Sequence, residues 1–127
     1  MKILVVEDHV TQLKLANHVL SASGHNVNSA ANAEQAFVSI KADRPTVILL
    51  DLTLPGMDGL TLVRKLKADA ETREIHIVAV TSYPEKYSKG DALAAGCDAY
   101  LVKPVDTRKL SDQLITASEG TDKGNMP

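Results

Sequence analysis

The sequence predicts an α/β fold in which helices cover both faces of a parallel five-stranded β-sheet. Two observations predict it. Short apolar runs alternate with longer segments in which apolar residues recur every three or four positions. Several of these runs are rich in Val, Ile and Leu without polar alternation, as in strands buried on both faces of a parallel sheet. The strands expected are Ile3–Val6, Asn26–Ala30, Val47–Leu50, Ile75–Val80 and Ala99–Val102.

A segment with helical periodicity follows each predicted strand, which gives a strand and a helix five times over. The fourth helix is expected at residues 85–95, although Pro84 and Gly90 both disfavour helix. Asp106 or Thr107 is placed to cap the fifth helix. The apolar positions expected to line the four clearer helices are Leu13, Ala16 and Leu20; Ala33, Ala36, Phe37 and Ile40; Leu60, Val63 and Leu66; and Leu110, Leu114 and Ile115.

Residues that favour turns and helix ends fall between these segments. Gly24 and Gly96 are expected to close the first and fourth helices, and Pro45 precedes the third strand. Asp58 and Gly59 are expected to form the turn and cap that start the third helix. Because right-handed crossover connections leave few topologies, we expect a doubly wound (βα)5 sheet with strand order 2-1-3-4-5.

Length and composition favour a single globular domain. We expect a domain at residues 1–118 and a short flexible tail at residues 119–127. The 14 basic residues are scattered and the net charge is −2, which argues against nucleic acid as a direct partner. No signal peptide or membrane-spanning stretch is visible, so no membrane partner is expected. The single cysteine, Cys97, is expected to be a small buried residue, and a cytoplasmic location follows from its lack of a disulfide partner.

Chemically active side chains follow the predicted strands at their carboxyl ends. They are Glu7 and Asp8 after the first strand, Asp51 after the third, Thr81 at the end of the fourth and Lys103 after the fifth. In open α/β sheets, binding sites form beyond these strand ends, where the strand order reverses. With the order 2-1-3-4-5 that crevice lies between the first and third strands, and the five side chains are expected to converge there.

Three carboxylates in one crevice repel one another unless a cation lies among them. Oxygen ligands without a histidine or cysteine among them select a hard ion, so we expect Mg²⁺ or Mn²⁺. Asp8 and Asp51 would bind the ion directly and Glu7 through water. The backbone carbonyl of Thr53 is expected to supply a further ligand.

A carboxylate can take up a phosphoryl group as an aspartyl phosphate, and Asp51 is the predicted acceptor. Such a transfer needs mainly positioning and charge neutralisation. The metal ion, the ammonium of Lys103 and the hydroxyl of Thr81 would supply them. His9 is expected to be an exposed residue at the helix start, with a contact to the phosphodonor as the alternative.

Four motifs together resemble the receiver domain of bacterial response regulators, the phosphoacceptor domain of two-component signalling. They are VVEDH, DLTLPGMDG, VAVTSYP and AAGCDAYLVKP, and the resemblance runs from Lys2 to about Ala117. It implies a flavodoxin-like fold. Receiver domains are themselves a well-known example of the strand order given above, so that order does not rest on the pattern alone.

The resemblance implies that Asp51 accepts a phosphoryl group from a sensor histidine kinase or a histidine phosphotransfer protein. It implies that Glu7 and Asp8 bind Mg²⁺ and that Lys103 contacts the acyl phosphate. The domain would be a signalling phosphoprotein and not an enzyme, although it would assist its own phosphorylation and slow autodephosphorylation.

The resemblance also implies how the domain switches. Thr81 and Tyr100 resemble the family's switch residues, and the bond between Lys103 and Pro104 is often cis in the family. Phosphorylation would change the face built from the fourth helix, fifth strand and fifth helix, which would then control a partner protein. Homodimer formation on activation stays open, as does whether the chain acts alone or begins a longer regulator.

The chain departs from the family's usual residues near the site. The acid pair is Glu7 and Asp8 where two aspartates are more usual, and Ser82 stands where alanine is more usual. Both departures are expected to preserve the site. We hypothesise that the ring of Tyr83 shields the acyl phosphate from water and slows its hydrolysis.

Three other functions compete with this interpretation. A phosphohydrolase with an aspartate nucleophile needs a second acid two residues later, where this chain has Thr53. A flavin-binding flavodoxin needs a polar phosphate loop after the first strand, where Glu7 and Asp8 would repel the phosphate. A docking module that is never phosphorylated (a pseudo-receiver) is the third, and the complete set of site residues counts against it.

Overall fold

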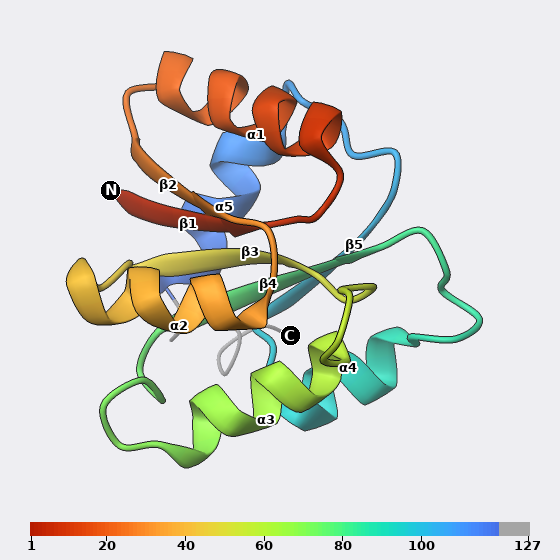
Figure 1. Cartoon of the computed structure of the whole chain (residues 1–127). Coiled ribbons are helices and arrows are strands. Elements are labelled where there is room, and N and C mark those ends of the chain that lie inside the picture. Colours follow the sequence, from red (N-terminus) through yellow and green to blue (C-terminus); the bar gives the residue numbers. More distant parts are fainter. Residues whose placement is uncertain (120–127) are drawn as a thin grey trace.

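The computed structural model describes residues 1–119 and shows strands that alternate with helices (Figure 1). The strands are β1 (Lys2–Val6), β2 (Asn26–Ala30), β3 (Val47–Asp51), β4 (His76–Thr81) and β5 (Ala99–Val102). The helices are α1 (Val10–Ala22), α2 (Ala33–Ala42), α3 (Gly59–Ala68), α4 (Lys89–Ala95) and α5 (Leu110–Glu119). Every predicted strand is confirmed to within one residue at each end.

The strands are all parallel and lie in the order β2-β1-β3-β4-β5, which confirms the predicted doubly wound, flavodoxin-like fold. The chain passes outward from β1 to β2 and then returns to place β3 on the other side of β1. Ile3 in β1 therefore pairs with Val27 on one side and Val47 on the other. The reversal of strand order falls between β1 and β3, so the carboxyl ends of these two strands lie side by side.

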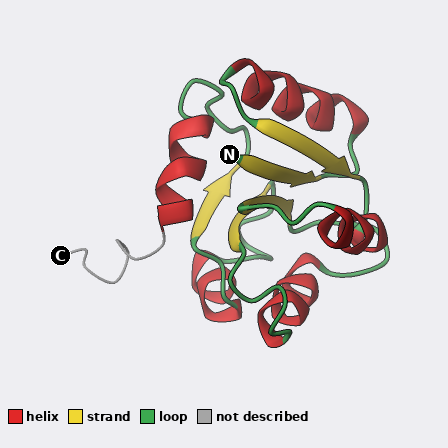
Figure 2. Ribbon diagram, turned by 90° about the vertical axis from the view of Figure 1, so that its left-hand side faces the viewer, coloured by secondary structure: helices red, strands yellow, loops and turns green. Residues whose placement is uncertain are grey.

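Alternate side chains of the strands build two cores, one on each face of the sheet. In β1, Leu4 and Val6 belong to the core that α2, α3 and α4 cover, whereas Ile3 and Val5 belong to the core under α1 and α5 (Figures 1 and 2). All residues of β3 are buried, which explains why this strand shows no polar alternation. Since helices cover both faces, polar side chains of the central strands gather at the strand ends.

The fourth helix is shorter than the predicted range of 85–95. It begins at Lys89, and the residues before it form a separate turn in which the N–H of Tyr87 donates to the carbonyl of Tyr83. The side chain of Ser88 caps α4 by accepting the N–H of Asp91 at 3.1 Å. A capping residue has an extended backbone, so the helix cannot run continuously through this position.

The predicted cap of the fifth helix is wrong. α5 begins at Leu110, and Asp106 instead accepts the N–H of Arg108 at 2.9 Å, which closes the preceding turn. Thr107 lies within that turn. α5 extends through Glu119, which the sequence analysis assigned to the tail, and residues 120–127 of that predicted tail lie outside the described residues.

Two residues expected to face the core are partly exposed. The exposed fractions of Phe37 and Ile115 are 38% and 40%. Each directly follows a buried residue, Ala36 or Leu114, and so lies about 100° further around its helix, at the edge of the apolar stripe. Periodicity identified the correct stripe but overestimated its width.

Several smaller predictions are confirmed. Gly24 and Gly96 end α1 and α4 with φ of +92° and +121°, a backbone conformation that glycine adopts at little cost. Cys97 is buried, as expected. Within residues 1–119, none of the helices has the length and apolar character that a membrane span requires.

Asp58 and Gly59 join the loop after β3 to α3. As predicted, Asp58 caps the helix, and its side chain accepts the N–H of Leu60. The N–H of Gly59 donates to the carbonyl of Leu52 at 3.0 Å, and a Cβ at Gly59 would lie 2.5 Å from the Cα of Leu52. Glycine is therefore required here, and the start of α3 is held against the residue that follows Asp51.

Gly59→Ala is expected to destabilise the domain by about 1–3 kcal/mol, because the added methyl group meets backbone atoms that cannot rotate away. Gly90→Ala is the matched control, since a Cβ there would have no neighbour closer than 3.9 Å. That control is expected to be neutral or stabilising by up to about 1 kcal/mol, because alanine favours helix. Urea unfolding measures both changes, and equal stability of Gly59→Ala and wild type would contradict the close approach.

Candidate functional site

The acidic residues predicted for the site come together at the carboxyl edge of the sheet. Glu7 follows β1, and Asp51 is the last residue of β3, the strand beside it. Both are only 6% exposed, whereas Asp8 is exposed. Carboxylate oxygens of the three side chains all lie within 4.8 Å of one another. The predicted convergence of the acids is therefore present.

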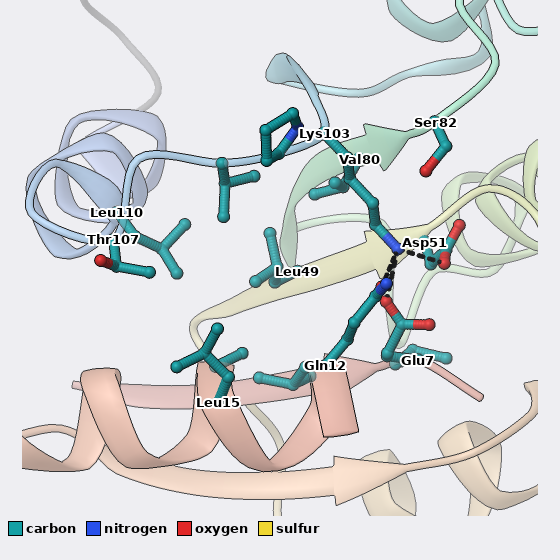
Figure 3. Close-up of a pocket in the computed structure, with 15 residues that line it drawn as sticks. Glu7, Gln12, Leu15, Leu49, Asp51, Val80, Ser82, Lys103, Thr107 and Leu110 are labelled. Carbon is teal, nitrogen blue, oxygen red and sulfur yellow. Dashed lines mark hydrogen bonds and ion pairs between the residues drawn. The ribbon is translucent and has the colours of Figure 1, made fainter. Parts of the chain in front are cut away.

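Lys103, which follows the edge strand β5, also contacts this acidic cluster. Its ammonium donates to Glu7 Oε1 at 2.7 Å and to Asp51 Oδ2 at 2.9 Å (Figure 3). The Lys103 side chain is 17% exposed, so solvent screens these ion pairs less than it screens surface pairs. The two contacts link the residue after β5, at the edge of the sheet, to the ends of β1 and β3.

The backbone after each strand orients the two buried carboxylates. Asp51 Oδ1 accepts the N–H of Thr53 at 2.8 Å, and Glu7 Oε2 accepts the N–H of His9 at 3.1 Å. In both cases the donor lies two residues after the acid, so local chain geometry fixes the carboxylate. His9 itself is exposed and directly precedes α1, as expected.

The charges in this cluster do not balance, because one ammonium faces three carboxylates. Burial raises the pKa of Glu7 above its ordinary value; nearby Asp51 acts in the same direction, while Lys103 acts against it. Burial alone would lower the pKa of Lys103, but its hydrogen bonds and ion pairs with Glu7 and Asp51 raise it. A donor set made of oxygen atoms with surplus negative charge fits a hard divalent cation such as Mg²⁺ or Mn²⁺.

Thr81 lies beside this cluster and is completely buried at the end of β4. Its neighbour Val80 pairs with Asp51 in the sheet. The Oγ1 of Thr81 accepts the N–H of Tyr83 at 2.9 Å, so its side chain is bonded to the connection that leads to α4. Tyr83 itself is half exposed.

Tyr100, the other predicted switch residue, contacts the same connection from β5. Its hydroxyl donates a hydrogen bond to the carbonyl of Tyr87. Burial, with a smaller contribution from the charge of Glu85, raises the pKa of Tyr100, so the phenol retains the proton that it donates. The bond between Lys103 and Pro104 is cis, as the resemblance implied.

A pocket of about 340 Å³ opens beside the ammonium of Lys103 (Figure 3). Its walls are mainly apolar side chains of α1, the sheet, the β5–α5 loop and α5: Leu15, Leu49, Val80, Val105 and Leu110. Gln12 of α1 lies at the same place, and its Oε1 accepts a hydrogen bond from Lys103. Gln12 is not among the residues predicted from the sequence, where its only signal is its position four residues after Asp8.

Comparison with known proteins identifies the family of this chain. Residues 3–115 match the response regulator receiver domain family. The chain is 31% identical over 112 residues to the polar-differentiation response regulator DivK of Brucella anthropi, and the match covers 88% of this chain and 91% of DivK. It is 37% identical over 105 residues to the response regulator PleD of Caulobacter vibrioides, but there the match covers 83% of this chain and only 23% of PleD.

A solved structure shows the same fold. It is the receiver domain of a sensor histidine kinase from Pseudomonas aeruginosa, with a magnesium ion coordinated in its active site cleft. The two structures share a TM-score of 0.83 at 30% identity, over 93% of this chain and 97% of the other. With the family match over most of its length, the present chain belongs to the response regulator receiver domain family of two-component signalling.

Proposed function

We propose that Asp51 accepts a phosphoryl group from the phosphohistidine of a sensor histidine kinase or a histidine phosphotransfer protein, and that the phosphorylated domain controls a partner protein. The observation that carries the proposal is the arrangement around Asp51. Its carboxylate is buried, Thr53 and Lys103 each bind one of its oxygens, and two further carboxylates lie beside it.

In the proposed transfer, the bond between phosphorus and the donor's imidazole nitrogen breaks while a bond forms between phosphorus and a carboxylate oxygen of Asp51. The products are an aspartyl phosphate and the free donor histidine. Glu7, Asp8 and Asp51, with the backbone carbonyl of Thr53, would hold Mg²⁺, which when bound neutralises charge on the phosphoryl oxygens. Lys103 would donate to one phosphoryl oxygen, because its ammonium is already 2.9 Å from Asp51 Oδ2.

Thr81 and Tyr100 would carry the change away from Asp51. Phosphorylation adds roughly one and a half to two negative charges, which attract a hydroxyl donor. If the Thr81 side chain turns toward the phosphoryl group, it gives up the N–H of Tyr83 and alters the connection before α4. Tyr100 is bonded to the carbonyl of Tyr87 in that connection, so its ring would adjust together with the connection.

The proposed output surface consists of α4, β5 and α5. Each element carries one large exposed apolar side chain: Leu93, Val102 and Ile115 are 42%, 45% and 40% exposed. Contiguous apolar patches mark surfaces that bind other proteins, so we expect a partner to cover these three side chains together. A change in the connection before α4 would alter how this surface is presented to the partner.

Wild-type protein treated with Mg²⁺ and acetyl phosphate is expected to gain one phosphoryl group, visible as a single adduct in the intact mass. Asp51→Asn should show no adduct because it lacks the nucleophile, and neither should a sample with EDTA, in which the phosphoryl charge is not neutralised. Folded wild-type protein that gains no mass in excess donor would contradict the proposal. The docking-module alternative, with the acids serving only in recognition, would then be favoured.

In metal-free protein at pH 7, Glu7→Gln is expected to increase the free energy of unfolding. Since the pKa of Glu7 is raised above 4.5 by folding, its contribution to stability is present at low pH and is lost as the pH rises through the folded-state pKa. Glutamine escapes that loss and still offers an oxygen to Lys103. Added Mg²⁺ should stabilise wild type more than the variant, because the variant has one carboxylate fewer.

Urea unfolding between pH 4 and pH 7, in EDTA and in Mg²⁺, measures this effect. Glu74→Gln is the matched control, because Glu74 is exposed and lies away from the acidic cluster. The gain from Glu7→Gln should be absent at pH 4 and grow toward neutral pH. Parallel pH profiles for wild type and Glu7→Gln in EDTA would show that burial of Glu7 does not oppose its ionisation.

Tyr83→Ala is expected to speed the loss of the phosphoryl group about two- to fivefold, because the ring would no longer keep water from the aspartyl phosphate. The half-exposed ring follows Thr81 by two residues, which supports this role. The decay of the adduct after donor removal gives the rate, with Phe37→Ala on α2 as the control for loss of an exposed aromatic ring. An unchanged decay rate in Tyr83→Ala would rule out shielding.

A further inference from the structure

We infer that Gln12 is a positioning residue for the phosphoryl transfer: it holds the ammonium of Lys103 over Asp51 from the opposite wall of the site. The inference rests on the proposed function and adds a residue to it. Gln12 lies in the first turns of α1, whereas Lys103 follows β5, and the hydrogen bond between them spans 91 positions of the chain.

Lys103 has three N–H donors and meets three oxygen acceptors. They are Glu7 Oε1, Asp51 Oδ2 and Gln12 Oε1, so the ammonium is held from β1, β3 and α1 at once (Figure 3). Because a lysine ammonium has no acceptor, only the carbonyl oxygen of the Gln12 amide can face it. Chemistry therefore fixes the orientation of the Gln12 side chain.

Gln12 differs from the other two partners because it is neutral and has no other role in the site. Glu7 and Asp51 belong to the group of acids that fits a cation, and Asp51 is also the proposed acceptor. Both carboxylates therefore have competing partners during the reaction, and their bonds to Lys103 weaken as those partners bind. Neither the metal ion nor the phosphoryl group would draw on Gln12, whose side chain reaches Lys103 from the exposed face of the site, so this bond can hold the ammonium while the carboxylates are engaged.

The pocket beside Lys103 explains why such a bond is needed. The Lys103 side chain itself lines this space of about 340 Å³, so packing does not confine it on that flank. The surrounding wall is mainly apolar, with Leu15 from α1 and Leu110 from α5 facing the same space (Figure 3). A long, flexible side chain next to an open pocket is held in place by its hydrogen bonds, and Gln12 supplies one of the three.

Gln12→Met tests the inference, because methionine has a similar length but only a weak acceptor. Phosphorylation by acetyl phosphate in Mg²⁺ is expected to slow about three- to tenfold, a moderate loss because two carboxylates still hold the ammonium. The affinity for Mg²⁺, measured by calorimetry, should change less than twofold. Gln113→Met is the matched control, because it makes the same change on α5 in a side chain that does not line the pocket.

A double-mutant cycle with Lys103→Met distinguishes positioning from other roles. If Gln12 acts through Lys103, Gln12→Met should cause no further slowing in the Lys103→Met background, where adduct formation is followed over hours. Equal slowing in both backgrounds would overturn the inference, because Gln12 would then act without the lysine. A large change in Mg²⁺ affinity would also overturn it.

The same experiment separates the failure of this inference from the failure of the proposed function. If wild type and Gln12→Met form the adduct at the same rate, the positioning role is overturned, and Asp51 remains the proposed acceptor. Wild-type protein that forms no adduct would overturn both. Urea unfolding of all the variants, Lys103→Met and its double variant with Gln12→Met included, confirms that every rate is measured on folded protein.

Discussion

The ion pairs of Lys103 with Glu7 and Asp51 are the interaction on which the rest of the site depends. The lysine lies 52 positions after Asp51 and 96 after Glu7, so only the completed sheet brings the three together. Both carboxylates are more than nine-tenths buried. Loss of the lysine would leave two buried carboxylates without a compensating charge, and an uncompensated buried charge typically costs about 3–5 kcal/mol.

The parallel sheet makes this arrangement possible because it delivers the end of every strand to one edge. Reversal of the strand order between β1 and β3 brings Glu7 and Asp51 side by side, and β4 lies between β3 and β5, the strand that Lys103 follows. The lysine must therefore reach past the end of β4, where Thr81 is buried. Four of the five strands, β1, β3, β4 and β5, end at functional groups, and a slip in the register of any of the four would move its group out of the site.

Most of the fold and the acidic cluster could be predicted from the sequence, because both follow from strong local patterns. Buried parallel strands appear in the sequence as continuous apolar runs. The residue that follows such a run therefore lies at the carboxyl end of a strand, which is the edge of the sheet where the site forms. The start of α4 could not be predicted in this way, since it depends on whether Ser88 or an earlier residue accepts the helix N–H groups. The exposure of Phe37 depends on how much of α2 the sheet covers, which periodicity does not report.

Long-range side-chain contacts were the other part that the sequence did not reveal. Nothing in the neighbourhood of Gln12 indicates that a lysine 91 positions later will reach its amide. The bond from Tyr100 to the carbonyl of Tyr87 likewise depends on the turn before α4, which the sequence analysis took for helix. Motifs identify which residues belong to a site, whereas the partners that hold those residues in place come from three-dimensional packing.

The close approach of Gly59 to Leu52 fastens the start of α3 to the residue that follows Asp51. The loop of residues 52–58 is fastened at both ends, by Thr53 to Asp51 and by Gly59 to Leu52. The connection of residues 82–88 has the same length, but residues 82–86 are all exposed. Gly59 ties α3 to the backbone beside Asp51, whereas Tyr87 ties the turn before α4 to Tyr100, so a movement of Tyr100 in the proposed switch would be passed on to that turn.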